Sequence, residues 1–120
     1  VFYLDVVPDI PNVVNQSPVP TWGLDRIDER DLLLDNTYSV VGDGTGITAY
    51  VIDSGIRVTH DEFKVAGSDE SRASYGINTS GDDSEIDCLG HGTHVAGTVG
   101  GLTYGVAKNV ELIAVKAFNC

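Results

Sequence analysis

The residues best suited to chemistry lie in a glycine-rich run. Residues 87–98 place His91 between two glycines, and His94 follows three positions later. Glycine on both sides leaves the backbone free and leaves room for a substrate beside the imidazole. The run after His91 is apolar enough to begin a helix packed on a sheet. The positive end of a helix disfavours imidazolium, so His91 would remain available as a base. The alternative is a glycine-bracketed turn with two structural histidines.

An acid follows a predicted strand earlier in the chain. Residues 46–52 are apolar and β-branched, which predicts a strand buried on both faces, and Asp53 then leads into a turn at Gly55. Chemistry in an open parallel sheet gathers beyond the carboxyl ends of the strands, where Asp53 would lie. Most acids at such a position only cap a turn. An acid here, followed by a glycine-flanked histidine at a helix start, is a rarer pair and favours an acid–base site.

These stretches resemble the subtilisin-like serine peptidases, or subtilases, and within them the proteinase K and aqualysin-like branch. The resemblance is carried by residues 22–28, by residues 50–56 with His60 and Phe63, and by residues 91–98, and it extends over about residues 17–120. The order of acid before histidine is also that of subtilisin. The resemblance implies that His91 is the general base of a catalytic triad and that Asp53 orients its imidazole.

A triad of this kind also needs a serine, and no serine here has suitable surroundings. The family places it in a Gly-Thr-Ser-Met-Ala-like turn far downstream and adds an asparagine as an oxyanion-hole donor. Neither motif occurs in these 120 residues. The resemblance therefore implies a serine endopeptidase that hydrolyses peptide bonds with a serine outside this chain, and we expect the chain alone to be inactive. The alternative is a catalytically inert relative that serves as a binding or scaffold protein.

The expected fold is α/β, with a mainly parallel subtilisin-like sheet, helices on both faces and a truncation at the C-terminus. Residues 110–118 predict a core strand, and a chain end soon after it would leave one sheet edge bare and apolar. Residues 68–87 are expected to be a polar loop. Residues 1–16 resemble the tail of an inhibitory prosegment, with a short strand over residues 1–7. The alternative is a disordered N-terminus. The peptidase part is then residues 17–120.

The acids are densest in the N-terminal third of the chain. Asp25, Asp28 and Glu29 fall at i, i+3 and i+4, on one face of a helical turn, where like charges repel unless a cation compensates. Calcium accepts six to eight oxygens at flexible angles and suits such a group. The resemblance implies a calcium site that Asp35 and Thr37 close. The competing explanation is a solvated, salt-bridged surface helix.

Two further histidines have structural interpretations. Two histidines three apart could bind zinc, but zinc peptidases need an acid beside the first, where this chain has Gly92. We therefore expect His94 to be buried against the sheet. His60, shortly after the predicted acid, is also expected to be structural.

The two cysteines, Cys88 and Cys120, could be free buried thiols. The resemblance implies instead that they form a disulfide, because the equivalent pair is bridged in the aqualysin-like branch. A bridge fits an oxidising compartment, and the expected location is extracellular, with synthesis as a zymogen.

Composition narrows the choice of partners. The chain has 18 acidic and 7 basic residues and a net charge of −11, which argues against nucleic acid or an anionic membrane as a partner. No run is long enough to span a bilayer. The expected partners are protein or peptide substrates, together with the chain's own prosegment or the rest of the peptidase domain. The acids of residues 82–87 could hold a second cation, although such a run is more often a solvated loop.

Overall fold

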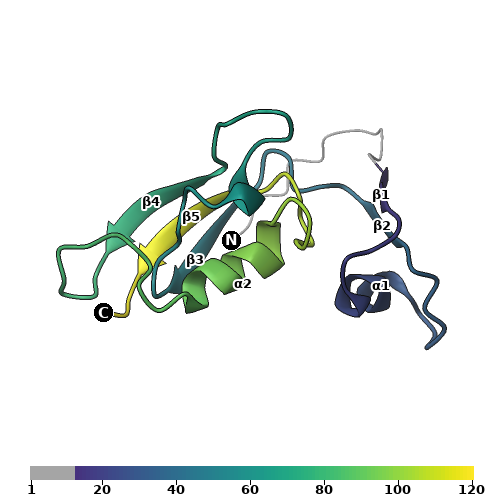
Figure 1. The fold of residues 1–120 in the computed structure, drawn as a ribbon, viewed down its shortest axis with the longest axis horizontal. Helices are drawn as coiled ribbons and strands as arrows, with labels where there is room; N and C mark the ends of the chain where they lie inside the picture. The colour runs from purple at the N-terminus through teal and green to yellow at the C-terminus, as the bar shows by residue number, and fades with distance from the viewer. Residues whose placement is uncertain (1–12) are drawn as a thin grey trace, which may run out of the picture.

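The computed structural model describes residues 13–120, so the strand expected over residues 1–7 lies outside them. A three-stranded sheet with one long helix forms the larger part, and a small two-stranded sheet with a short helix lies beside it (Figure 1). The elements in order are β1 (Val13–Gln16), α1 (Trp22–Asp28), β2 (Tyr38–Val41), β3 (Thr48–Asp53), the 3-10 turn η1 (Asp61–Phe63), β4 (Ala73–Asn78), α2 (His91–Gly100) and β5 (Glu111–Lys116).

The larger sheet has the order β3-β5-β4, and all its strands are parallel. This confirms the predicted α/β fold with a parallel sheet. The register pairs Asp53 with Lys116 and Lys116 with Asn78, so the carboxyl ends of all three strands meet at one edge. Chemistry-bearing groups that follow these strands are thereby brought close together.

The predicted core strand over residues 110–118 is confirmed, because β5 has β3 on one side and β4 on the other. In the described residues the unpaired sheet edges therefore belong to β3 and β4, and not to β5. One prediction about this sheet is wrong. β4 lies within residues 68–87, which were expected to be a polar loop. Its sequence alternates Ala73, Tyr75 and Ile77 with polar or small residues, which is a strand signal, although only Ala73 is buried.

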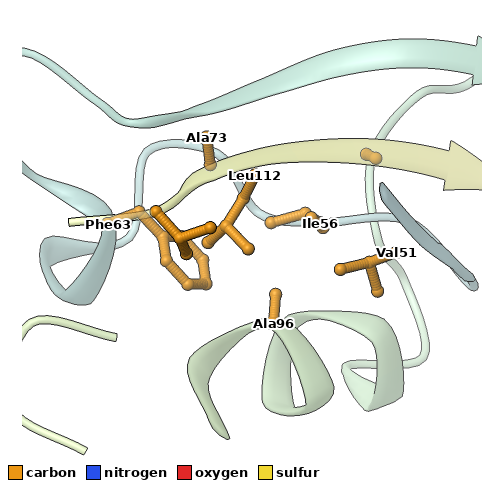
Figure 2. Packing of buried hydrophobic residues seen from close by; sticks show 8 residues of the cluster. Val51, Ile56, Phe63, Ala73, Ala96 and Leu112 are labelled. Carbon is orange, nitrogen blue, oxygen red and sulfur yellow. The ribbon is translucent and has the colours of Figure 1, made fainter. Parts of the chain in front are cut away.

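Helix α2 packs on one face of the sheet and closes the core. Ala96 of α2 points toward Val51, Ile56 and Leu112 (Figure 2), and all four side chains are buried. Close packing of a small helix residue against branched residues of the sheet and of the turn after β3 leaves little free volume. Truncation of Leu112 to alanine is therefore expected to cost about 2–5 kcal/mol of stability.

The opposite face of the sheet is open in the described part of the chain. Tyr50 is 67% exposed and Ile52 is 70% exposed, so β3 is buried on one face and not on both as expected. Alternation along the strand sends Val51 and Asp53 toward α2 and the other two side chains away from it. Within residues 13–120, α2 thus supplies helical cover to one face of this sheet.

The N-terminal elements are attached to the segment that follows α2. Tyr38 is fully buried, and its hydroxyl donates to the Val106 carbonyl at 3.0 Å. Gln16 Nε2 donates to the Thr103 carbonyl at 3.1 Å. Because β1 pairs antiparallel with β2, residues 13–16 of the predicted tail are part of a sheet with residues 38–41. No helix in residues 13–120 has both the length and the apolar character needed to cross a membrane.

Candidate active site

The predicted acid and base lie within hydrogen-bonding distance of each other. Asp53 is the last residue of β3, and His91 is the first residue of α2. His91 Nδ1 lies 2.8 Å from Asp53 Oδ1 and 2.9 Å from Oδ2. The Asp53 side chain is 12% exposed and that of His91 is 72% exposed. The arrangement therefore buries the carboxylate and leaves the imidazole open to an approaching group.

The electrostatics of the pair favour an ionised acid. Burial raises the pKa of Asp53, but the hydrogen bonds from the His91 ring and from the Ser54 N–H, at 2.7 Å, outweigh it, so the pKa lies below its usual value. A carboxylate only accepts hydrogen bonds, so Nδ1 of His91 must carry the proton in this contact. The lone pair is then on Nε2, where a neutral histidine can act as a base.

The glycines beside His91 are required by the fold. A Cβ on Gly92 would lie 2.1 Å from the Gly55 carbonyl oxygen, so only glycine lets α2 approach the end of β3 this closely. Gly90 has φ +79° at the N-cap of α2, a conformation that glycine adopts without strain. The sequence suggested that these glycines leave room for a substrate. In the structure, Gly92 is needed for the close approach of α2 to β3, and Gly90 for the turn that precedes the helix.

Sequence reasoning gave no role to two residues that join the acid to the base. The Ser54 hydroxyl accepts from the Gly92 N–H at 2.9 Å and donates to Asp87 Oδ1 at 2.8 Å. Asp87 Oδ2 accepts from the Thr93 N–H at 2.9 Å. An acid just before a predicted helix start is a capping signal, and it could have identified Asp87. The role of Ser54 depends on a contact between distant segments, which the sequence does not reveal.

A second set of contacts anchors the loop before α2 to the end of β5. Cys88 and Cys120 form a disulfide, as the resemblance implied. Lys116 is 2% exposed, and its ammonium group lies 3.0 Å from Asp82 Oδ2 and 2.7 Å from the Ser84 carbonyl. The hydrogen bond from Lys116 holds the pKa of Asp82 far below its usual range. Asp82 is thus neutralised by a lysine, which argues against a second cation in this loop.

The prediction that His94 is buried against the sheet is wrong, because its side chain is exposed. The buried positions of α2 are Gly92, Ala96 and Gly100, which are spaced by four. At about 100° per residue, His94 lies on the opposite side of the helix from them. It lines an apolar cavity of about 610 Å³ between α1 and α2.

His60 makes structural contacts. Its Nδ1 accepts from the Glu62 N–H at 3.2 Å, and its ring centroid lies 5.7 Å from that of Phe63. The contacts cap η1 and cover a buried aromatic ring, in keeping with the structural role expected for it.

Three of the five predicted calcium ligands lie together. Asp25, Glu29 and Asp35 offer carboxylate oxygens within 4.8 Å of one another. Burial and the neighbouring carboxylates, Asp35 first, raise the pKa of Glu29. Asp28 lies outside this group, because its Oδ2 accepts from the Ser39 N–H at 2.6 Å.

The oxygens near this cluster are not all satisfied by the protein. Asp28 Oδ1 is buried and has no hydrogen-bond partner in the described part of the chain. The N–H of Thr37 donates to Asp35 Oδ1 at 2.8 Å, which places Thr37 beside the cluster. This acidic group could hold a metal ion, since carboxylates this close gain from an added positive charge.

Comparison with known proteins identifies the family. Residues 44–120 match the model of the subtilase family, so the chain belongs to the subtilases. It is 54% identical to the alkaline serine exoprotease A of Vibrio alginolyticus over 82% of the chain. It is 46% identical over its whole length to an extracellular serine proteinase of Thermus sp. strain Rt41A.

A third relative and a solved structure agree. The chain is 47% identical over 91% of its length to a subtilisin-like protease 6 of Trichophyton equinum. The crystal structure of a cold-adapted subtilisin-like serine proteinase matches 83% of the chain with a TM-score of 0.72 and 50% identity. The chain spans 18%, 28% and 25% of the three relatives and 34% of the solved chain.

Proposed function

We propose that this chain supplies the acid and the base of a secreted serine endopeptidase. A serine elsewhere in the full-length protein attacks the peptide carbonyl, and Nε2 of His91 takes its proton. His91 then protonates the leaving amine, and Asp53 holds the ring and stabilises the imidazolium that forms. Protein or peptide substrates follow from this reaction. The Vibrio relative, a serine exoprotease, and the Thermus relative, an extracellular serine proteinase, support both the chemistry and the extracellular location.

The observation that carries the proposal is the contact between His91 Nδ1 and the buried carboxylate of Asp53 at 2.8 Å. This contact fixes which nitrogen is basic and turns it outward. A histidine that served only to cap or fill the fold would have no need of an ionised partner on one nitrogen and an open second nitrogen. The exposed imidazole therefore supports a role as proton acceptor.

We extend the proposal to a structural calcium ion at the acidic cluster. Asp25, Glu29 and Asp35 would hold it, with Thr37 and Asp28 as the remaining predicted contributors. The unpartnered Asp28 oxygen and the raised pKa of Glu29 support a cation at this position, because both indicate negative charge that the protein itself does not compensate. The ion would supply charge neutralisation that ties the end of α1 to the loop before β2.

We also propose that a prosegment tail ends at residue 16 and that the peptidase part begins at residue 17. N-terminal sequencing of the mature protein tests this boundary. A mature N-terminus near residue 17 is expected, and one before residue 13 would contradict the boundary.

The peptidase proposal is tested on the full-length protein. It should hydrolyse a chromogenic peptide, and a fluorophosphonate probe should label one serine per molecule. Prior labelling should abolish hydrolysis, because the probe modifies the serine that His91 activates. Absence of both labelling and hydrolysis in folded, processed protein would favour the alternative, an inert binding or scaffold protein.

A further inference from the structure

Two side chains that the proposed chemistry does not use connect the strand of the acid to the helix of the base. Ser54 is 1% exposed, and its hydroxyl accepts from the Gly92 N–H at 2.9 Å while donating to Asp87 Oδ1 at 2.8 Å. Ser54 directly follows Asp53, and Gly92 directly follows His91. The hydroxyl therefore bridges the backbone beside the acid to the backbone beside the base.

Asp87 performs the capping that the N-cap of α2 cannot. A helix leaves its first N–H groups without partners, and the N-cap here is Gly90, which has no side chain. Asp87 Oδ1 accepts from the Gly90 N–H and its Oδ2 accepts from the Thr93 N–H, both at 2.9 Å. With Ser54 on the Gly92 N–H, two side chains from outside the helix hold its first turn. A negative charge at this end of a helix is also favourable.

A third contact makes the connection rigid. The Thr93 hydroxyl donates to Asp87 Oδ2 at 2.5 Å and accepts from the Arg57 N–H at 2.9 Å. Burial raises the pKa of Asp87, but the hydrogen bonds from Thr93, Ser54 and the Gly90 N–H outweigh it, so the carboxylate stays ionised and can accept them all. The turn after β3 is thus joined to α2 at two separate points.

We propose that Ser54 and Asp87 are positioning residues that set the ring of His91 against Asp53 and so aim Nε2 at the proton it must accept. The proposal rests on the proposed peptidase function. A displacement of a catalytic group by about 1 Å can cost about 10²-fold in rate. Loss of either residue is therefore expected to lower kcat by roughly 10- to 100-fold and to leave KM unchanged, because neither side chain is placed to contact a substrate.

The test uses the full-length protein and three variants. Ser54→Ala deletes one hydroxyl oxygen, and Asp87→Asn replaces one acceptor oxygen by an N–H donor that must face another donor. The matched control is Asp43→Asn. Asp43 makes similar contacts, to the Thr45 N–H at 2.9 Å and to Asn109 Nδ2 at 2.7 Å, but it precedes β3 and lies at the opposite end of that strand from the acid.

Titration with the fluorophosphonate counts competent active sites, and kcat is expressed per titrated site. The proton on His91 Nδ1 is followed by its low-field NMR resonance. We expect Ser54→Ala and Asp87→Asn to lower kcat per site and to shift or broaden that resonance, and Asp43→Asn to change neither. Ser54→Thr, which keeps the hydroxyl, should recover a large part of the lost kcat.

Several results would overturn the assignment. The first is a folded Ser54→Ala variant with the kcat per site of the wild type. The second is a variant that has fewer titrated sites but an unchanged kcat per site, because this indicates a purely structural role. If Asp87→Asn does not fold, Ser54→Ala decides the question alone, since it removes a single atom. Failure of the peptidase function would look different, because wild-type protein would then neither label nor hydrolyse.

Discussion

Two groups of carboxylates in this molecule are held in opposite ways. Around the proposed active site, Asp53 and Asp87 accept hydrogen bonds from N–H and O–H groups, which lower the pKa of each despite burial. At the end of α1, carboxylates face one another, and burial together with neighbouring acids raises the pKa of Glu29. The first group is stabilised by donors of the protein itself. The second group also accepts N–H donors, from Asn36 to Asp25 and from Thr37 to Asp35, but the repulsion among its carboxylates would be relieved by a positive charge brought from outside.

The largest expected effect is the loss of kcat when His91 or Asp53 is replaced. In the full-length protein, His91→Ala should lower kcat by about 10⁶, the magnitude found in subtilisin when the base is removed. Asp53→Asn should lower it by about 10⁴, the magnitude found in a chymotrypsin-type triad when the acid is replaced by asparagine and the ring is held in the wrong tautomer. Circular dichroism should show folded protein in both cases. Activity within tenfold of wild type in either variant, measured by peptide hydrolysis, would assign the chemistry to other residues.

The sequence predicts the pair of Asp53 and His91 better than it predicts the strands and contacts that surround the pair. Asp53 and His91 stand out because an acid after a strand and a histidine between glycines are local signals. The parallel sheet is also predictable, since β3 and β5 are short apolar runs. β4 was missed, because its alternating residues Ala73, Tyr75 and Ile77 lie within a polar stretch, and its place is set by pairing with β5.

The remaining differences have the same origin in long-range contacts. The sequence excluded a zinc site and so favoured a buried His94, but the small residues of α2 decide which face meets the sheet. Asp28 was grouped with the other acids by helical spacing, yet the loop returning to β2 brings the Ser39 N–H to it. Contacts between segments distant in sequence decide these positions, and local periodicity does not report them.

Removal of the disulfide would destabilise the loop that precedes α2, and it would leave the hydrogen-bond donors to Asp53 and Asp87 in place. The bridge between Cys88 and Cys120 closes a loop with a sequence separation of 32. Replacing both cysteines by serine should destabilise the protein by about 3–4 kcal/mol in the chain-entropy model. Urea unfolding in an inactive His91→Ala background measures this, because it avoids self-digestion. Alkylation of two thiols in denatured, unreduced wild type would show that no bridge forms.

Removal of a cation should affect the second group alone. A chelator is expected to lower the melting temperature of the full-length protein, and calcium at 100 times its Kd should restore about 2.7 kcal/mol by mass action. Glu29→Gln should have opposite effects in the two conditions. It should stabilise the chelated protein by relieving repulsion and should reduce the gain from calcium.

The control for this experiment is Glu70→Gln, which removes an exposed acid far along the chain from the cluster. It should shift the melting temperature equally with and without calcium. If Glu29→Gln behaves in the same way as this control, the acidic helix is a solvated surface and holds no ion.

The smallest expected effect concerns Asp43, a third carboxylate that, like those around the proposed active site, accepts hydrogen bonds from the protein. Hydrogen bonds from Thr45 and Asn109 lower the pKa of Asp43 from 3.8 to about 2. Between these values the unfolded chain binds more protons than the folded one, so stability falls as the pH falls from about 4 toward 2. Asp43→Asn should therefore flatten the acid side of the stability curve, by less than about 1 kcal/mol because solvent screens the site. Urea unfolding between pH 6 and pH 3 in the His91→Ala background measures the slope, and Asp83→Asn, an exposed acid in another loop, serves as its control. An unchanged slope in Asp43→Asn would mean that donors of the protein do not stabilise this carboxylate in the way they stabilise those of the dyad.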